Sequence, residues 1–592
     1  MVYTHFLEKF KNIIVNNSSS YALIKNNEKI SWTDYYIKCS SFANALNNFN
    51  VNSNECVAIM GFNDPAWFIS AVGSALFGVP FTGIYPTNGP EEVDHNLNIT
   101  NSSVLVIENR KLLDGIKLNM SLKLILIYGE DVQESTYQNI PIFNFKKFLN
   151  VYRKKNFGFK KCEKNDTLCY IFTSGTTGLS KAVTITHENV SFTADRMTKL
   201  YQLKNERIVS YLPLSHIAAS MIDIFCHFYH QGPVCFAKPD ALKGSLKDTL
   251  LEVRPTMFFG VPRVWEKFYE AMMKVAEEKY KGTIGSIVKA IVQYIKNQTS
   301  NVHLKNQESI SPGLIEKLVY KILGKKLSKT IKTNLGLDQC KYFMTGAAPI
   351  SKDILQYFAS IDIIINELYG MSETTGVITA SLPNQYKWGS AGKPLIGTIK
   401  IADDGEILYS SKCVFNGYHQ NQAATKETIE DGWLHTGDIG EMRDGYLYIT
   451  GRKKELLITA GGENVAPVKI EERIKHFGPA LSNIVVIGDK QKYLTCLITI
   501  GIKENSNELL NKTVDSNAIT IQDALKSSLW KDYIQNAINN YNKNPISNAQ
   551  KIQKFVLLEE ELTIQNNCMT PTMKLKRAKI YKRFEKEIGS MY

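Results

Sequence analysis

The sequence predicts an α/β protein with a large N-terminal domain of mostly parallel sheets, a small β-barrel subdomain, and a small mobile α/β domain after it. Short apolar runs alternate with helix-length segments over most of the chain, the pattern of parallel sheets covered by helices. From about residue 401, glycines punctuate short strands, as in an antiparallel sheet. After residue 452, a charged stretch precedes a last segment with its own apolar runs. We therefore expect domains at 1–452, with a β-rich subdomain at 401–450, and at 453–592.

The apolar runs of the first domain have the length of strands and the composition of a buried sheet. In chain order they read "CVAIMGF", "SVLVIE", "LKLILIYG", "LCYIFT", "PVCFA" and "TMFFGV". One stretch, 65–90, is uncharged and long enough to cross a membrane, but Gly73, Gly78 and Pro80 interrupt it. We expect a buried helix there, followed by a buried strand.

Two segments depart from this alternation. Residues 270–335 are rich in lysine and helical in pattern, and residues 503–552 are rich in asparagine without a strong core signal. Both are expected to be surface insertions.

The charge of the chain favours anionic partners. Seventy Lys and Arg against 57 Asp and Glu give a net charge of +13, which suits nucleotides, coenzyme A or lipid headgroups. A solvated basic surface explains the same charge equally well. No RNA-binding or helix-turn-helix signature stands out, so no nucleic-acid partner is predicted.

The ten cysteines are scattered, with no CxxC pair and no His/Cys cluster at zinc spacing. A reducing compartment is the simpler inference. The N-terminal stretch "MVYTHFLEKFKNIIVNN" lacks the apolar core of a secretory signal. We expect a cytoplasmic protein that can attach peripherally to the cytosolic face of an internal membrane such as the endoplasmic reticulum.

The loop "TSGTTGLSK" at 173–181 has the chemistry of a phosphate-binding loop. It follows the strand-like run "LCYIF", its glycines permit unusual backbone angles, and its hydroxyls and Lys181 offer donors and positive charge. It is not a Walker loop, because Lys181 follows Gly178 by three residues. An ordinary Gly/Ser/Thr turn is the alternative for this loop taken alone.

Two more polar loops follow strand-like runs: "TGAAPI" at 345–350 after "YFMT", and "NELYGMSETTG" at 366–376 after "IDIII". Because ligands bind at the carboxyl ends of strands in open α/β sheets, the three loops are expected to converge. Tyr369 could then stack on a purine, Glu373 could bind Mg²⁺, Asp438 could accept bonds from ribose hydroxyls, and Arg452 could bind ribose or phosphate. Each has an ordinary structural alternative; their joint occurrence in this order favours the functional interpretation.

Longer runs make the pattern specific. They are "GFNDPAWFISAVG" (61–73), "VSYLPLSHIAA" (209–219), "FAKPDALKGSL" (236–246), "GVPRVWEK" (260–267), "ITGRKKELLITAGGENVAP" (449–467) and "PTMKLKR" (571–577). With these runs the chain resembles the adenylate-forming superfamily of AMP-forming acyl-CoA synthetases, and within it the bubblegum-type long-chain fatty acid CoA ligases. The resemblance covers essentially the whole chain and is weakest at 280–330 and 503–550.

The resemblance implies a reaction and a site. ATP, a long-chain fatty acid and coenzyme A would give acyl-CoA, AMP and diphosphate through an acyl-adenylate, with Mg²⁺ as cofactor. The implied nucleotide-binding residues are Thr173, Ser174, Gly175, Thr176, Thr177, Gly178, Lys181, Gly346, Ala347, Glu367, Leu368, Tyr369, Gly370, Met371, Ser372, Asp438 and Arg452. Thr176 and Glu373 would hold Mg²⁺, and the implied catalytic residues are Lys574, His216 and Glu373.

Three alternatives stay open. An amino-acid adenylating module needs a carboxylate just after the position of His216, where this chain has Ile217-Ala218-Ala219, although Asp223 is near. A fatty acyl-AMP ligase would pass its product to a carrier protein, and a catalytically inactive relative would only bind lipid. Ala182 and Ser411 stand where many relatives have glycine, which affects loop geometry and removes no charged group.

Two mechanical features are also expected. Lys454 lies between the last strand of one domain and the body of the next, where a few backbone angles can swing a whole domain. Residues 314–333 place apolar side chains on one helical face and lysines at every fourth position, which predicts peripheral attachment to anionic membranes. A helix packed on its own domain is the alternative for that segment.

Overall fold

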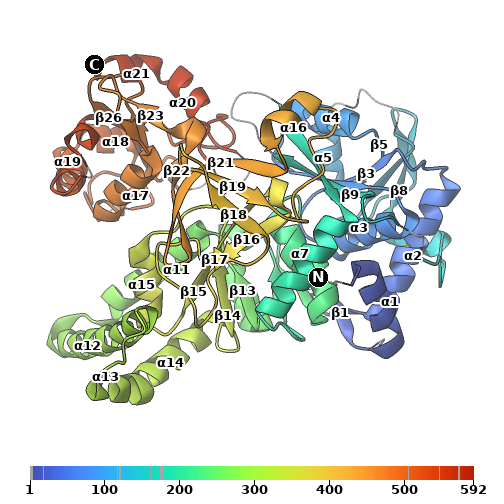
Figure 1. Ribbon diagram of the computed structural model, residues 1–592, viewed down its shortest axis with the longest axis horizontal. Helices are drawn as coiled ribbons and strands as arrows, with labels where there is room; N and C mark the ends of the chain where they lie inside the picture. The colour runs from blue at the N-terminus through green and yellow to red at the C-terminus, as the bar shows by residue number, and fades with distance from the viewer. Residues whose placement is uncertain are drawn as a thin grey trace.

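The computed structural model describes residues 4–17, 19–116, 118, 122–159, 162–173, 179–503, 506–511, 513–545, 547–570 and 574–592. The N-terminal part lies on one side of the molecule, and the C-terminal part sits beside it above a group of projecting helices (Figure 1). The predicted α/β class is confirmed, with parallel sheets first, an antiparallel sheet next and a separate α/β region last.

The largest sheet has eight strands in the order β10-β9-β4-β3-β5-β6-β8-β7. Its inner strands pair in parallel, and only the edge strands β10 and β7 are antiparallel to their neighbours. The strands are β3 (Cys56–Met60), β4 (Phe81–Ile84), β5 (Ser102–Ile107), β6 (Leu124–Ile127), β7 (Ser135–Tyr137), β8 (Ile140–Asn144), β9 (Thr167–Thr173) and β10 (Lys181–Thr186). The helices of this part are α1 (Phe6–Asn16), α2 (Trp32–Asn48), α3 (Pro65–Phe77), α4 (Pro90–Ile99), α5 (Arg110–Asp114), α6 (Phe145–Val151) and α7 (His187–Leu200).

The uncharged stretch 65–90 forms the buried helix α3 and the buried strand β4, as predicted. Asp64 caps α3 by accepting a bond from the Ala66 N–H, and Gly78 ends the helix in the left-handed conformation that glycine adopts without strain. In the described part of the chain, no helix is long and apolar enough to cross a membrane.

Two further sheets complete the N-terminal part. A five-stranded sheet has the order β13-β14-β15-β16-β17, and a four-stranded sheet has the order β11-β12-β1-β2. The strands are β1 (Tyr21–Lys25), β2 (Glu28–Ser31), β11 (Ile208–Ser210), β12 (Val234–Phe236), β13 (Met257–Phe259), β14 (Tyr342–Thr345), β15 (Ile365–Met371), β16 (Gly376–Ala380) and β17 (Lys393–Pro394). Between them run α8 (Ile217–Ala219), the π-helix η1 (Ser220–Phe225), α9 (His227–His230), η2 (Ala241–Lys243), α10 (Leu246–Val253), α15 (Lys352–Ser360) and η4 (Ser372–Thr374).

The helices of 262–335 project from the body at one corner of the molecule (Figure 1). They are α11 (Pro262–Lys279), α12 (Gly282–Gln307), α13 (Leu314–Val319), the π-helix η3 (Tyr320–Gly324) and α14 (Lys325–Leu335). Asp362 ties them to the body, because it accepts bonds from His303 Nε2 at 3.0 Å and from the Tyr320 hydroxyl at 2.8 Å. The segment is helical and largely exposed, as predicted.

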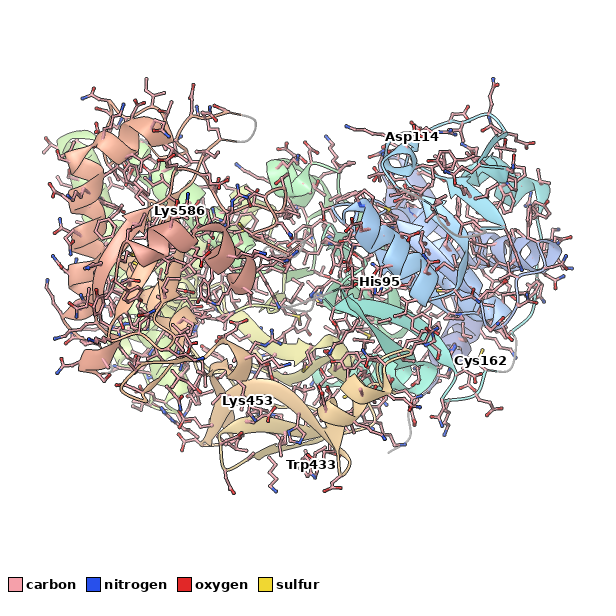
Figure 2. All side chains as sticks on the ribbon, turned by 90° about the horizontal axis from the view of Figure 1, so that it is seen from above. His95, Asp114, Cys162, Trp433, Lys453 and Lys586 are labelled. Carbon is pink, nitrogen blue, oxygen red and sulfur yellow. The ribbon has the colours of Figure 1, made fainter. Side chains whose placement is uncertain are left out.

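The β-rich subdomain is a curved antiparallel sheet. It consists of β18 (Thr398–Ile401), β19 (Glu406–Ser410), β20 (Ile429–Glu430), β21 (Trp433–Arg443) and β22 (Tyr446–Arg452), with α16 (Gln422–Thr428) beside it. Seen from above, Lys453 lies where this sheet approaches the C-terminal part, and Trp433 lies at its far edge (Figure 2).

The C-terminal part has hydrophobic cores of its own. Its elements are η5 (Lys453–Glu455), β23 (Leu457–Ile458), β24 (Asn464–Val465), α17 (Pro467–Phe477), β25 (Leu481–Ile487), β26 (Leu494–Ile500), α18 (Ile521–Lys526), α19 (Ser528–Asn542), η6 (Asn548–Gln550), β27 (Ile552–Leu557), α20 (Arg577–Arg583) and α21 (Glu585–Gly589). The prediction that 503–552 is a surface insertion is wrong: α19 buries Trp530, Ile534, Ile538 and Tyr541 in the core against α17. Polar residues separate these positions, so the helical spacing of the apolar residues is only a weak signal in the sequence.

Candidate active site

The loop 173–181 joins the ends of two paired strands. Thr173 ends β9, Lys181 begins β10, and the two residues face each other in the ladder. Ser174, Gly175, Thr176, Thr177 and Gly178 lie outside the described residues, so their predicted phosphate contacts stay predictions. Lys181, at the start of β10, therefore lies on the edge strand of the large sheet.

Tyr418 connects Lys181 with Glu373. The Tyr418 hydroxyl donates to Glu373 Oε1 at 2.7 Å, and the Lys181 ammonium lies 4.8 Å from the centre of the Tyr418 ring. A β-bridge between Val183 and Tyr418 fixes this arrangement. Glu373 is only 6% exposed, so its carboxylate is oriented before any ligand arrives.

The second and third polar loops meet because their strands are neighbours. Thr345 at the end of β14 pairs with Glu367 on β15, which places Gly346 and Ala347 beside Glu367 and Leu368. A Cβ atom on Gly346 would lie 2.8 Å from the Leu368 carbonyl oxygen, so only glycine fits. Ala347 has a φ of 69°, a left-handed conformation that costs free energy and is found most often at functional sites.

The rest of the segment continues along β15 into η4. Gly370, Met371 and Ser372 follow Tyr369 directly, and the ladder with β16 has a bulge between Tyr369 and Gly370. A Cβ atom on Gly370 would stand 1.8 Å from the Gly376 carbonyl oxygen. The backbone therefore turns sharply where the sequence predicts contact with the nucleotide.

Asp438 and Arg452 are partners across the β21–β22 hairpin. They face each other in the ladder, with Arg452 Nε 3.2 Å from Asp438 Oδ1. The Tyr369 hydroxyl donates to the other carboxylate oxygen, Asp438 Oδ2, at 2.8 Å. Burial raises the pKa of Asp438, while Arg452 and the Tyr369 hydroxyl act in the opposite direction. One carboxylate, one guanidinium and one phenol are thus fixed together, as binding of a ribose would require.

Lys574 comes to this cluster from the C-terminal part. Its backbone N–H donates to Thr570 Oγ1 at 3.0 Å and its carbonyl oxygen accepts from the Thr570 N–H at 2.8 Å, which holds the residue in a loop, as predicted. Burial of its ammonium and the positive charge of Arg452 lower the pKa of Lys574, while Asp438, Glu455 and Glu373 raise it. Lys574 therefore faces residues of the N-terminal part.

His216 also lies close to Lys574. It is the N-cap of α8, where its Nδ1 accepts a bond from the Ala218 N–H at 3.2 Å. Burial and the positive charge of Lys574 lower the pKa of His216 to about 4. The imidazole is consequently neutral at physiological pH and can accept or donate a hydrogen bond without adding charge.

The cluster has the donors that a nucleotide and Mg²⁺ need. Lys181, Arg452 and Lys574 supply positive charge, and Glu373 supplies the oxygen that Mg²⁺ prefers. Among the described residues, no group of three or more His, Cys, Asp or Glu side chains could hold a metal by itself. This fits Mg²⁺, which commonly binds to one or two carboxylates together with substrate phosphates. Thr345 Oγ1, at the edge of the site, is buried and has no partner in the described chain, as a group awaiting a ligand or water would be.

The sequence alone did not predict that Tyr418 belongs to the site. It stands in "FNGYHQ", between a strand and a helix, and no spacing marks it. Its place depends on the bridge to Val183, which is more than two hundred residues away in the sequence. Only the pairing of distant strands reveals it.

Comparison with known proteins identifies the family. The model of the AMP-binding enzymes matches residues 11–419, and the model of an AMP-binding enzyme C-terminal domain matches residues 454–592. Long-chain-fatty-acid–CoA ligase ACSBG2 of Gallus gallus is 38% identical over 629 residues, covering 99% of this chain and 81% of that protein. ACSBG2 of Homo sapiens is 35% identical, covering 98% and 91%, and heimdall of Drosophila melanogaster is 34% identical, covering 95% and 90%.

Solved structures show the same fold. The anthranilate CoA ligase AuaEII in complex with anthranoyl-AMP superposes with a TM-score of 0.73 at 17% identity, covering 100% of this chain and 99% of that one. The o-succinylbenzoate CoA synthetase of Bacillus subtilis with its acyl-adenylate has a TM-score of 0.69, also at 17% identity, covering 98% of each chain. The chain therefore belongs to the AMP-binding enzymes, the adenylate-forming superfamily, in the group of bubblegum-type long-chain-fatty-acid–CoA ligases.

Proposed function

We propose that this protein joins a long-chain fatty acid to coenzyme A, using ATP and releasing AMP and diphosphate through an acyl-adenylate. One observation carries the proposal: Lys574 of the C-terminal part lies close enough to His216, Glu373, Asp438 and Arg452 to interact electrostatically with each of them. The named relatives have this activity in their names, and the retained charged groups support catalysis over mere lipid binding.

In the first step, a carboxylate oxygen of the fatty acid bonds to the α-phosphorus of ATP, and diphosphate leaves with the electrons of the broken P–O bond. Two anions must approach each other, so positive charge that is already in place lowers the barrier. Lys574 and Arg452 would contact the α-phosphate and the incoming carboxylate, and Lys181 would contact the outer phosphates. Mg²⁺, when bound at Glu373 and Thr176, supplies further positive charge to the phosphates.

The nucleotide is held by the residues around β15 and the β21–β22 hairpin. Asp438 accepts bonds from the ribose hydroxyls, and Tyr369, which donates to Asp438, keeps that carboxylate in position. Gly346, Ala347 and the segment from Glu367 to Ser372 line the adenine and the α-phosphate.

In the second step, the thiol sulfur of coenzyme A attacks the acyl carbon and AMP leaves. Lys574 has no task in this step and occupies space beside the reacting carbon. We propose that the domain 453–592 then turns relative to the domain 1–452 about Lys454, which removes Lys574 from the site.

The acyl chain leaves the site past His216. Ile217, Ala218 and Ala219 follow it, and the buried side chains of Ile222 and Phe225 continue the apolar surface. An amino-acid substrate would leave its ammonium without a carboxylate beside His216, so a hydrocarbon chain fits this surface better.

The test is a panel of acids from short to very long chain, scored by AMP release with and without coenzyme A. We expect AMP release to be greatest for long-chain acids and to require coenzyme A for turnover. The proposal is wrong if the enzyme accumulates acyl-AMP even when coenzyme A is present and transfers the acyl group only to a carrier protein. No adenylation of any fatty acid would identify an inactive relative.

We also propose peripheral attachment to an anionic membrane through 314–333, on the cytosolic face of an internal membrane such as the endoplasmic reticulum. The apolar face of this segment points to solvent, since Leu314, Leu318 and Ile322 are 87%, 60% and 59% exposed. The buried positions are Gly324 and Ser328, so the helices pack on the body through small residues instead. The exposed lysines of the segment, which lie four residues apart, add attraction to anionic headgroups. They are Lys317, Lys321, Lys325 and Lys329.

The test replaces these four lysines with glutamate and measures sedimentation with phosphatidylserine-containing vesicles. Binding should fall strongly, and circular dichroism should be unchanged because all four side chains are exposed. The matched control makes the same charge change at four exposed lysines of the C-terminal part. These are Lys526, Lys531, Lys543 and Lys582. Equal loss of vesicle binding in both variants would show a general effect of charge. No loss of vesicle binding in the variant of 314–333 would refute the proposed surface.

A further inference from the structure

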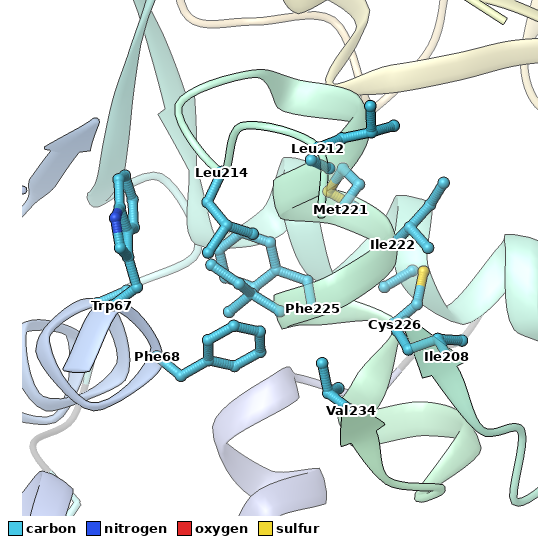
Figure 3. Close-up of a cluster of buried hydrophobic side chains, with 14 of the residues drawn as sticks. Trp67, Phe68, Ile208, Leu212, Leu214, Met221, Ile222, Phe225, Cys226 and Val234 are labelled. Atoms are coloured by element: carbon cyan, nitrogen blue, oxygen red, sulfur yellow. The ribbon is translucent and has the colours of Figure 1, made fainter. Parts of the chain in front are cut away.

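A small cavity lies against the π-helix η1, which follows His216 and α8 in the chain. It is lined by η1, β11 and β13, with Leu212, Ala219, Ile222, Met257 and Phe259 contributing apolar side chains. Its volume is about 10 Å³, room for a single water molecule. Figure 3 shows Leu212, Met221 and Ile222 close together beside the π-helix, with Cys226 and Ile208 next to them.

One charged residue lines this apolar cavity. Asp223 is 6% exposed, and burial raises its pKa to about 7, so that much of it is neutral at physiological pH. Its polar neighbour is Ser210, whose Oγ accepts a bond from Asn63 Nδ2 at 2.8 Å and whose hydroxyl proton is therefore available to Asp223. Among the described residues, Asp223 forms no ion pair with a Lys, Arg or His side chain.

The surroundings do not explain a carboxyl at this position. Tyr211, the other polar lining residue, already donates its hydroxyl to the Phe259 carbonyl oxygen at 2.8 Å. Asn63 also donates to the Leu212 carbonyl oxygen at 2.8 Å, and its Oδ1 is buried with no partner in the described part of the chain. A buried carboxyl is destabilising unless its oxygens are hydrogen-bonded, so a role toward a ligand would account for it.

The local backbone is unusual as well. Asp223 lies in the π-helix η1, which follows α8 without interruption. Single π-helical turns are rare and occur frequently at functional sites, because the extra residue rotates side chains that would otherwise face elsewhere. Here the π-helical turn carries both Ile222 and Asp223, which line the same cavity.

We propose that Asp223 recognises a hydroxyl group on the middle of the acyl chain, so that the enzyme prefers mid-chain hydroxy fatty acids over unsubstituted acids of the same length. This rests on the proposed function, which places the acyl carboxylate beside His216. Seven residues of helix separate His216 from Asp223, a distance of about 10 Å along the axis. A chain that starts at His216 therefore passes Asp223 well beyond its α- and β-carbons, and its hydroxyl replaces the water that the cavity can hold.

The experiment measures kcat/KM for pyrophosphate exchange, which reports the first step alone. The acids are an unsubstituted long-chain acid and its α-hydroxy, mid-chain hydroxy and ω-hydroxy derivatives. We expect the wild-type enzyme to favour the mid-chain derivative about tenfold, the size of one good hydrogen bond. Asp223→Leu should abolish this preference while retaining the unsubstituted acid as a substrate. Asp223→Asn, which keeps a donor and an acceptor, should preserve most of it.

The control variant is Met257→Leu, which changes the same cavity without removing a polar group and should leave the ratio unchanged. Equal kcat/KM for all four acids in the wild-type enzyme overturns the proposal, as does an equal loss for all four acids in Asp223→Leu. Should Asp223→Leu fail to fold, the wild-type ratios and Asp223→Asn decide the matter. Failure of every long-chain acid to exchange pyrophosphate would instead refute the proposed function.

Discussion

Lys574 is the residue on which the proposed mechanism depends most directly. Removing its ammonium takes one positive charge from the place where two anions meet, and loss of a single electrostatic contact of this kind typically lowers a rate by about 10²- to 10³-fold. We therefore expect Lys574→Ala to cripple acyl-AMP formation, measured by pyrophosphate exchange. Conversion of supplied acyl-AMP to acyl-CoA should be largely intact, because Lys574 is absent from the second step.

Lys576 provides the control for the loss of basic charge. Its ammonium donates to Asn567 Oδ1 at 2.7 Å, within its own domain, so Lys576→Ala should affect neither step. A second readout needs no turnover: because Lys574 contributes to the low pKa of His216, about 4, that pKa should rise in Lys574→Ala yet stay below its usual value, since burial remains. An NMR titration of His216 measures it. Equal loss of both half-reactions in the two variants would exclude Lys574 as the catalytic lysine.

Tyr418 and Tyr369 form a matched pair of phenols that support different ligands. Tyr418 orients Glu373, and Tyr369 orients Asp438. Tyr418→Phe should raise the Mg²⁺ concentration for half-maximal adenylation several-fold, because Glu373 loses the bond that positions it. Tyr369→Phe should instead raise the KM for ATP at saturating Mg²⁺. If both variants shift the same parameter, the two carboxylates do not have separate roles.

The β21–β22 hairpin is the element that would link the site to the proposed domain movement. Its register brings Asp438 and Arg452 together, and the short turn η5 follows at once. Lys453 is anchored to the sheet through Asp404 and Glu406, at 2.6 and 2.9 Å. Lys454 is exposed and forms no ion pair with another described residue, so a rotation that begins there leaves the sheet undisturbed.

Proline at this position tests the hinge. Lys454→Pro fixes φ and should impede the swing, so pyrophosphate exchange should survive while thioester formation drops about tenfold or more. Lys454→Ala removes the same side chain but leaves φ free, and should support both steps. Equal survival of both steps in Lys454→Pro would place the hinge elsewhere.

The elements of the fold were largely predictable because each has a local cause. The alternation of apolar runs and helix-length segments gave the parallel sheets, and the breaks at Gly78 and Pro80 correctly separated α3 from β4. The error at 503–552 has a local cause too. In α19 the apolar residues recur at helical spacing, but the many asparagines between them lowered the apparent hydrophobicity below that of a core helix.

At the scale of the whole molecule, the sequence predicted which residues form the site better than it predicted how those residues contact one another. The motifs pointed to Glu373, Asp438, Arg452 and Lys574, and in the structure Arg452 and Lys574 each interact electrostatically with both carboxylates and with each other. The pairing of Asp438 with Arg452 depends on strand register, and the position of Lys574 depends on how one domain lies on another. Neither is encoded in a local pattern, which is also why Tyr418 escaped notice.

An ion pair and a His–Asp contact hold the C-terminal part in the arrangement that brings Lys574 to the site. Helix α17 supplies one partner of each: Lys475 Nζ lies 3.5 Å from Glu266 Oε2 on α11, and His476 Nδ1 lies 2.9 Å from Asp353 Oδ2 on α15. All four side chains are partly accessible to solvent, so each pair contributes at most about 1 kcal/mol. A movement of the C-terminal part about Lys454 must break both pairs, and they therefore favour adenylation without preventing the second step.

A charge exchange tests this arrangement. Lys475→Glu sets two carboxylates against each other across the interface and should lower pyrophosphate exchange several-fold, while conversion of supplied acyl-AMP to acyl-CoA stays unchanged or rises. The double variant Lys475→Glu with Glu266→Lys restores attraction and should recover much of the exchange activity. High salt should narrow the difference between the single variant and the wild type, because the pair is accessible to ions. If Lys475→Glu slows both half-reactions equally and the double variant recovers neither, the pair stabilises the fold rather than one orientation of the domain.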